Sequence, residues 1–205
     1  MTLGVLGGTF DPIHLGHVAA AEAAQQALSL ESILLIPSHI PPHRRDPVTA
    51  SAEDRFAMVE LAAGGRPGWS ASHLELDRPG PSYTYDTLLE LGEGLDQGSQ
   101  IFFITGADAF AEIATWSRYP AVLDLAHFVV VSRPGITLDS LRERVPSAFH
   151  RHSPADTRVI LVEAHTPDVS STEIRRRVRA GESLSGFVPD PVAAYIATHR
   201  LYSGK

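Results

Sequence analysis

The sequence predicts an α/β protein built on a single doubly wound parallel sheet, with a short helical extension at the C-terminus. Strand-like and helix-like runs alternate along the chain, which is typical of βαβ units. Several strand candidates, such as residues 101–104 and 128–131, are continuous apolar runs, as expected for parallel strands buried on both faces. A length of 205 residues suits one compact domain. We therefore expect one domain over residues 1–205, with the helical part at about 170–205.

The individual elements follow from apolar periodicity and from the turn residues between the runs. Strands are predicted at residues 3–6, 32–37, 70–76, 100–105, 127–132 and 157–163. Helices are predicted at residues 18–28, 52–63, 84–91 and 171–179. The charged stretch 138–153 is interpreted as a solvated face. Because such sheets bind ligands beyond the carboxyl ends of their strands, the loops after Leu6, Pro37, Thr105 and Glu163 are expected to open onto one site.

The residues after the first predicted strand form a candidate phosphate-binding site. The string G-G-T-F-D-P-I-H-L-G-H spans residues 7–17 and runs into an alanine-rich helix candidate. Glycines let the backbone approach an anion closely, and a helix N-terminus offers free N–H groups. His14 and His17 are three residues apart, so we expect them on one helical face, donating to phosphate oxygens. A purely structural turn and cap stays open as an alternative, as does a metal site of His14, His17 and Asp11.

A second anion site is predicted near the C-terminus, in the string D-V-S-S-T-E-I-R at residues 168–175. Ser170 and Glu173 have the spacing of a capping box, which predicts a helix start there. Hydroxyl and free N–H groups at such a start can bind an anion. Arg175 lies one turn into the helix, and Arg179 follows on the same face. A capped basic helix with a structural role only is the alternative.

Composition and charge exclude several classes of protein. The chain has no cysteine, so it has neither a disulfide framework nor a thiol nucleophile. Lys205 is the only lysine among 17 lysine and arginine residues, which argues against a lysine Schiff base or lysine general base. Neither a Walker A string nor G-x-G-x-x-G occurs. The net charge of −7 disfavours a nucleic-acid surface, and no signal peptide or membrane span is recognisable. We expect a cytoplasmic enzyme that binds neither nucleic acid nor membrane.

The two anion-binding strings closely resemble the H-x-G-H and I-S-S-T-x-I-R elements of a nucleotidyltransferase superfamily, with Val169 in the isoleucine position. Between and after them, further blocks occur in the order found in bacterial nicotinate-nucleotide adenylyltransferases. These blocks are P-P-H-R at 41–44, G-P-S-Y-T-Y-D-T-L at 80–88, G-A-D at 106–108, Trp116, R-P-G at 133–135 and the ending 188–202. The resemblance covers nearly the full chain and implies a Rossmann-like nucleotidyltransferase fold.

The resemblance also implies which residues form the site. His14, His17 and Arg175 would be the catalytic groups at the phosphates. ATP would be bound by Gly7, Gly8, Thr9, Phe10, His14, His17, Gly106, Asp108, Ser171, Thr172 and Arg175. Ser171, Thr172 and Arg175 would hold the triphosphate from the side opposite the histidines. Asp108 would hold a ribose hydroxyl; a plain helix N-cap is its structural alternative.

The acceptor nucleotide would be bound by His43, Arg44, Tyr83, Thr84 and Trp116. By the resemblance, Trp116 stacks on the nicotinate ring, and the backbone near Tyr83 and Thr84 meets the ring carboxylate. Ordinary burial is the alternative for Trp116. The family usually has lysine where this chain has Arg44, so the positive charge is kept but its geometry differs.

The implied reaction joins ATP and nicotinate mononucleotide to give deamido-NAD and pyrophosphate. The attacking phosphate oxygen is already an anion, so in-line positioning and charge neutralisation suffice without a general base. Mg²⁺ is expected to arrive with ATP and not in an all-protein metal site. Nicotinamide mononucleotide and phosphopantetheine remain alternative acceptors, and a non-catalytic nucleotide sensor is a further alternative. The sequence leaves the oligomeric state open, and a homo-oligomer is compatible with it.

Overall fold

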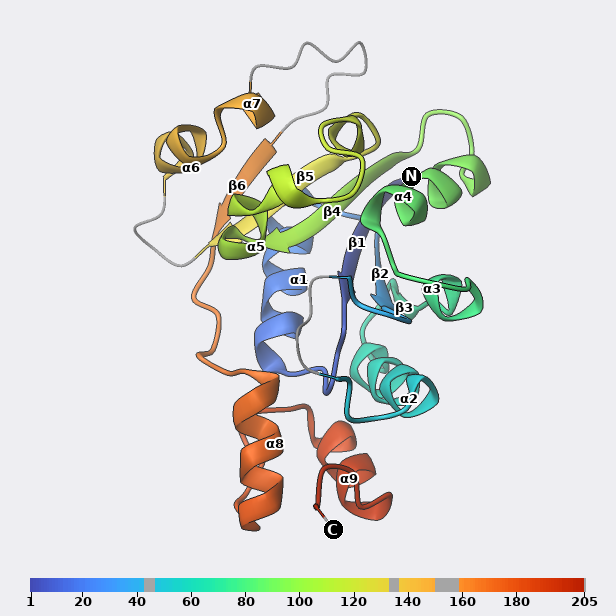
Figure 1. The fold of residues 1–205 in the computed structure, drawn as a ribbon, viewed down its shortest axis with the longest axis vertical. Coiled ribbons are helices and arrows are strands. Elements are labelled where there is room, and N and C mark those ends of the chain that lie inside the picture. The colour runs from blue at the N-terminus through green and yellow to red at the C-terminus, as the bar shows by residue number, and fades with distance from the viewer. Residues whose placement is uncertain (43–46, 133–136, 150–158, 205) are drawn as a thin grey trace.

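A computed structural model describes residues 1–42, 47–132, 137–149 and 159–204 (Figure 1). Its centre is a six-stranded parallel sheet in the order β3-β2-β1-β4-β5-β6. The strands are β1 (Thr2–Gly8), β2 (Ser32–Pro37), β3 (Trp69–Ala71), β4 (Gln100–Gly106), β5 (His127–Ser132) and β6 (Val159–Glu163). The order reverses between β1 and β4, and a crevice is expected at the carboxyl ends of the strands at such a point. The prediction of a doubly wound parallel sheet is confirmed.

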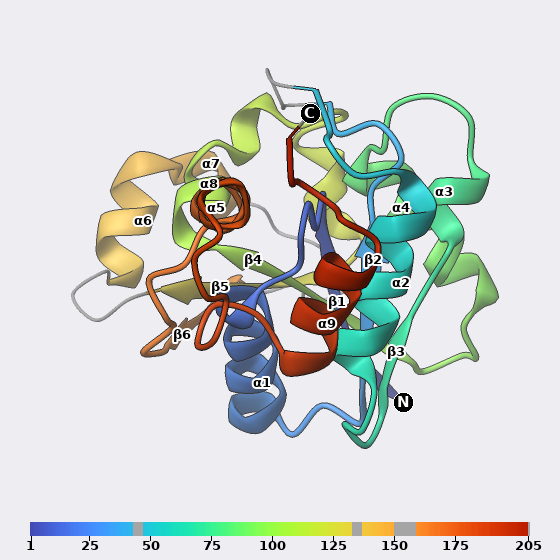
Figure 2. The same ribbon diagram turned by 90° about the horizontal axis from the view of Figure 1, so that it is seen from below.

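Helices cover both faces of the sheet and extend beyond it. The helices are α1 (Leu15–Leu28), α2 (Ala52–Ala63), α3 (Leu74–Asp77), α4 (Thr84–Gly94), α5 (Ala107–Ala111), α6 (Leu138–Arg144), α7 (Pro146–Phe149), α8 (Ser171–Ala180) and α9 (Asp190–Thr198), with 3₁₀ turns η1 (Ile113–Thr115) and η2 (Ala121–Asp124). Figure 2 shows α1 and α5 on opposite sides of the sheet. In Figure 1, α8 and α9 lie at the lower end of the molecule, beyond the strands.

Alternate strand residues separate the apolar core into two clusters, because successive side chains of a strand point to opposite faces. Leu6 and Ile104 pack on one face with residues of α1, α2, α8 and α9. Val5 and Phe103, their neighbours in the chain, pack on the other face with residues of α4, α5, α6 and the two 3₁₀ turns. Both faces are therefore buried, which explains the continuous apolar runs in the sequence.

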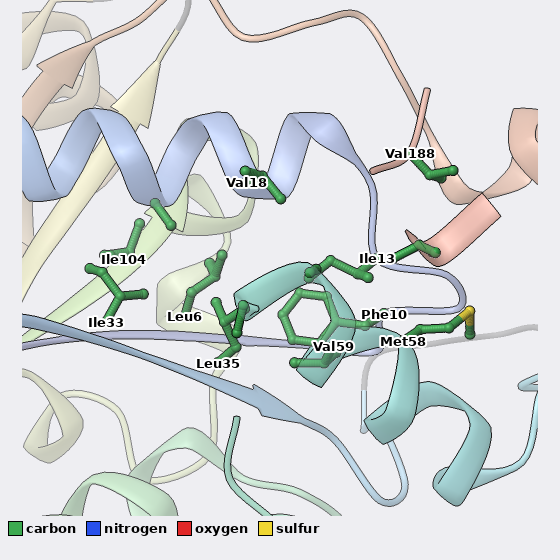
Figure 3. Close-up of a cluster of buried hydrophobic side chains, with 14 of the residues drawn as sticks. Leu6, Phe10, Ile13, Val18, Ile33, Leu35, Met58, Val59, Ile104 and Val188 are labelled. Carbon is green, nitrogen blue, oxygen red and sulfur yellow. The ribbon is translucent and has the colours of Figure 1, made fainter. Parts of the chain in front are cut away.

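The first core cluster anchors the loop that follows β1 (Figure 3). Phe10 is 1% exposed and Ile13 is fully buried, and both lie among side chains of α2 and the C-terminal segment around Val188. Burying these two side chains contributes on the order of 2 kcal/mol each. The loop that carries the histidines is thus fixed by hydrophobic packing on either side of Asp11.

Two sequence-based interpretations are wrong. The predicted strand 70–76 ends at Ala71 and is followed by the short helix α3. Residues 138–149 are not only a solvated face, because they form α6 and α7 and bury Leu141 and Val145 in the second core cluster. In the part of the chain that the structure describes, no helix has the length and apolar character needed to cross a membrane.

Candidate active site at the carboxyl ends of the strands

A cavity of about 960 Å³ opens beyond the carboxyl ends of β1, β2 and β4. Its volume is in the range typical of small-molecule and cofactor sites. Most of the predicted site residues line it, namely Gly7, Gly8, Thr9, Phe10, His17, Tyr83, Thr84, Gly106, Trp116, Ser171, Thr172 and Arg175. The tertiary structure therefore brings together residues 7–17, 83–84, 106–116 and 171–175, four stretches that are far apart in the sequence.

Four predicted site residues are not among those lining the cavity. His14 lies directly behind His17 and is 8% exposed. Asp108 is exposed in the first turn of α5, whose N-cap is Gly106, so the interpretation of Asp108 as a helix N-cap is wrong. His43 and Arg44 lie outside the described residues.

His14 and His17 cap the start of α1 reciprocally. His14 is the N-cap, and the backbone N–H of His17 donates to its Nδ1 at 3.4 Å. The backbone N–H of His14 donates in turn to Nδ1 of His17 at 3.3 Å. The two rings stack with centroids 3.6 Å apart, and the Phe10 ring lies perpendicular to the His17 ring with centroids 5.0 Å apart. Because Nδ1 accepts in both rings, the neutral rings carry their proton on Nε2 and can donate from there.

Burial and proximity keep both histidines neutral in the free protein. Burial lowers the pKa of His14 from 6.5 to about 4. Burial, with a smaller contribution from the neighbouring His14, lowers the pKa of His17 well below its usual value. A bound polyanion next to the rings would act in the opposite direction, since negative charge favours the imidazolium form. In the free protein the pair is therefore a neutral donor site, whose Nε2–H groups can donate to an anion.

The buried carboxylate of Asp11 holds the loop between β1 and α1 in place. Its carboxylate accepts the backbone N–H groups of Thr49 and Ala50 at 2.9 and 3.0 Å. Arg175 donates to the backbone oxygen of Asp11 at 2.6 Å and lies 3.7 Å from its carboxylate. The carboxylate oxygens are thus already engaged, and no cluster of metal-ligating side chains occurs among the described residues. The alternative of a metal site with His14 and His17 gains no support from this geometry.

The start of α8 lies against the start of α1. The hydroxyl of Ser171 donates to the backbone oxygen of Pro12 at 2.9 Å, across 159 positions of sequence. Ser170 is the N-cap of α8, as predicted, and accepts from the backbone N–H of Glu173 at 3.2 Å. The carboxylate of Glu173 binds Arg176 and so does not complete the predicted capping box. Two helix N-termini and Arg175 therefore converge on one end of the cavity, where an anion is stabilised by free N–H groups and by charge.

Another part of the cavity wall is aromatic and polar. Tyr83 is the N-cap residue of α4 and Thr84 its first residue, so free backbone N–H groups face this region. Trp116 is half-buried, and its ring meets the edge of Phe103 at 5.9 Å. A half-buried helix start in the same cavity as an indole ring suits a flat aromatic acid, because a carboxylate can meet N–H groups while the ring stacks.

Sequence analysis missed two buried charged residues at the cavity. Arg55 of α2 donates from one nitrogen to the backbone oxygens of Thr9 and Ser38 at 2.8 and 2.6 Å, which joins the ends of β1 and β2. Its sequence signal was an arginine on the otherwise apolar stripe of α2, where Met58 and Val59 are also buried. The second residue is Glu75, which lines the cavity although it is only 6% exposed. Glu75 was missed because residues 70–76 were predicted to form a strand.

Comparison with known proteins agrees with this site. Residues 5–177 match the family described as Cytidylyltransferase-like. A probable nicotinate-nucleotide adenylyltransferase from Roseiflexus sp. (strain RS-1) is 43% identical over 201 residues, covering 98% of this chain and 97% of the relative. The chain belongs to the nicotinate-nucleotide adenylyltransferase family. A second member of the family, from Thermus thermophilus, is also 43% identical and covers 98% of this chain and 100% of the relative.

Solved structures share the fold of the family. The nicotinic acid mononucleotide adenylyltransferase of Plasmodium falciparum complexed with NaAD superposes with a TM-score of 0.76 at 17% identity, covering 100% of this chain and 98% of that chain. The same enzyme complexed with APC gives a TM-score of 0.74 at 16% identity. These likenesses confirm the expected nucleotidyltransferase fold.

Proposed function

We propose that this protein transfers the adenylyl group of ATP to nicotinate mononucleotide, giving deamido-NAD and pyrophosphate in NAD biosynthesis. The full-length identity to members of the nicotinate-nucleotide adenylyltransferase family supports this reaction. The observation that carries the proposal within the structure is one cavity with two contrasting kinds of lining: His17, Arg175 and two helix starts, and Trp116 with the start of α4.

In the proposed reaction, a phosphate oxygen of nicotinate mononucleotide attacks the α-phosphorus of ATP in line. The bond from the α-phosphorus to the bridging oxygen breaks, and pyrophosphate leaves with the electron pair. No proton has to be removed from the nucleophile, so the protein contributes positioning and charge neutralisation. The Nε2–H groups of His14 and His17 and the guanidinium of Arg175 are suited to neutralise charge that develops on the phosphate oxygens. His14, the more buried of the pair, would donate from behind His17.

Further binding roles complete the proposal. The glycine turn at Gly7 and Gly8, with Thr9, would let the triphosphate approach the backbone, and Ser171 and Thr172 would hold it from the start of α8. The adenosine would lie near Gly106, with Asp108 at a ribose hydroxyl. The nicotinate ring would stack on Trp116 with its carboxylate near Tyr83 and Thr84, and His43 and Arg44 would reach the acceptor phosphate.

The remaining expectations belong to the same proposal. The nucleotide substrate would be Mg–ATP, with the ion held by phosphates and water, because the carboxylate nearest the phosphate loop is already occupied. We propose one domain over residues 1–205 with its helical part at about 170–205, and an enzyme of the cytoplasm that binds neither nucleic acid nor membrane.

The proposed function is tested by pyrophosphate release from Mg–ATP with three acceptors: nicotinate mononucleotide, nicotinamide mononucleotide and phosphopantetheine. We expect a strong preference for the acid. Equal rates with acid and amide would keep the reaction and refute recognition of the carboxylate near Tyr83 and Thr84. Preference for phosphopantetheine would refute the assignment of the acceptor. ATP binding without turnover of any acceptor would instead indicate a nucleotide sensor.

A further inference from the structure

Glu75 is a buried acidic residue at the cavity that the proposed reaction does not use. It comes from α3, lines the cavity together with Ser82, Tyr83 and Thr84, and is almost inaccessible to solvent. Burial raises the pKa of its carboxyl group, while hydrogen bonds from Thr87 and Ser82 act in the opposite direction. Burying a carboxyl group is costly unless its oxygens find donors, so its partners indicate what it does.

Both partners of Glu75 are hydroxyl groups whose orientation is fixed from the other side. The oxygen of Thr87 accepts from Nη2 of Arg78 at 2.8 Å, and the oxygen of Ser82 accepts from the backbone N–H of His39 at 2.8 Å. Neither donor can act as an acceptor. The hydroxyl hydrogens therefore point to other acceptors. Thr87 donates to Oε1 of Glu75 at 2.6 Å, while the backbone oxygen of Tyr83 is a more distant acceptor at 3.3 Å. Glu75 is thus the acceptor for Thr87, and the hydroxyl group of Ser82 also acts to lower its pKa.

These two hydroxyl groups lie on either side of Tyr83 and Thr84 in the sequence. Ser82 directly precedes Tyr83, and Thr87 follows Thr84 by three residues. The carboxylate of Glu75 therefore interacts with residues on both sides of Tyr83 and Thr84. Ser82 also links this turn to the loop after β2, because its backbone N–H donates to the oxygen of Ile40 at 2.9 Å. Tyr83 and Thr84 themselves remain directed to the cavity.

We propose that Glu75 is a positioning residue for the acceptor nucleotide, holding the start of α4 in the conformation that receives the aromatic acid. This inference rests on the proposed function, because it takes Tyr83 and Thr84 as the acceptor-binding residues. Glu75 acts through the Ser82 and Thr87 hydroxyl groups and not by contact with the reacting atoms. Its loss therefore affects binding of the acceptor and leaves the ATP end of the cavity unchanged.

The test is Glu75→Gln, assayed with each substrate varied in turn against saturating amounts of the other. Glutamine keeps the shape but replaces one acceptor oxygen with an NH₂ donor, so one hydroxyl hydrogen loses its partner. We expect KM for nicotinate mononucleotide to rise about tenfold, with KM for ATP and kcat changed less than about twofold. Glu90→Gln is the matched control, because Glu90 pairs with the same Arg78 at 3.0 Å but is exposed, and its kinetics should stay at wild-type values.

A second variant, Ser82→Ala, separates positioning from general stabilisation. If Glu75 acts through Ser82, the effects of the two variants on KM for the acceptor should be strongly non-additive in the double variant. Ser82→Ala also decides the question if Glu75→Gln does not fold. Equal changes in both KM values, or unchanged KM for the acceptor in a folded variant, would overturn the role of Glu75 alone. A wild-type chain that forms no deamido-NAD would overturn the proposed function, and this inference with it.

Discussion

Replacement of His17 by alanine tests whether the histidine pair serves catalysis or only the start of α1. The variant removes a ring that lines the cavity and whose Nε2–H can donate to a phosphate oxygen. Loss of one donor that acts on the transition state costs about 3 kcal/mol, so kcat should fall by about 10² to 10³. The effect on folding should be much smaller, because the lost contacts are one long cap hydrogen bond of 3.3 Å and the ring contacts to His14 and Phe10. These contacts amount to about 1–2 kcal/mol of unfolding free energy.

The two magnitudes are measured separately. Steady-state pyrophosphate release gives kcat and KM, and urea unfolding followed by circular dichroism gives the free energy of unfolding. His199→Ala is the matched control, because its ring also stacks on a neighbour, Tyr195, at 3.9 Å and its Nδ1 also contacts the backbone, but it lies in the exposed end of α9. It should lose no activity. Unchanged kinetics in His17→Ala would remove His17 from the mechanism, and a loss of activity explained entirely by unfolded protein would refute the catalytic interpretation.

Three further predictions concern residues that support the proposed phosphate-binding residues. The folded-state pKa of His14 lies below its unfolded value, so the stability that its neutral ring provides is complete above pH 6.5 and is lost as the pH falls towards 4. This contribution is about 3 kcal/mol, and urea unfolding of His14→Gln should show a correspondingly flatter pH dependence between these limits. Gly16→Ala should lower kcat/KM about tenfold, because an added Cβ would lie 3.1 Å from the His14 ring and displace it. The free energy of unfolding should stay nearly unchanged, because alanine favours the helix. A variant with full activity would contradict this prediction. Arg55→Leu should lower the free energy of unfolding by roughly 2–6 kcal/mol, because the backbone oxygens of Thr9 and Ser38 then stay buried without a donor. If urea unfolding shows a loss below about 1 kcal/mol, water replaces the guanidinium as the donor.

Part of the fold follows directly from local sequence patterns. The strands at 32–37 and 127–132 and the helix at 52–63 were predicted with the bounds that the structure has. Each is either a continuous apolar run or an amphipathic stretch with a clear N-cap residue, so local and tertiary preferences agree. The helix α1 begins three residues earlier than predicted, because the side chain of His14 supplies an unusual N-cap.

Other features could not be predicted, because they depend on partners that lie far away in the sequence. The run 70–76 was predicted as a strand, whereas in α3 the buried Glu75 accepts a hydrogen bond from Thr87 of the next helix, α4. The stretch 138–149 looks polar, because most of its residues are charged or small, yet a few apolar side chains bury it on the sheet. Burial of a carboxylate or of a sparse apolar face is visible only when its partners are known.

The sequence by itself determined the parallel α/β architecture and predicted the helix start at Ser170, because apolar periodicity, glycine turns and N-cap residues act over a few neighbouring residues. The order of its motifs carried the resemblance to the family. Only the tertiary structure decided that these helix starts meet, through Ser171 and the oxygen of Pro12, and that Asp11 is engaged by N–H groups and Arg175. It also decided that burial makes the histidine pair neutral in the free protein. The physical reason is that hydrogen bonding and desolvation of a side chain depend on which distant segments surround it, and that is fixed only when the sheet assembles.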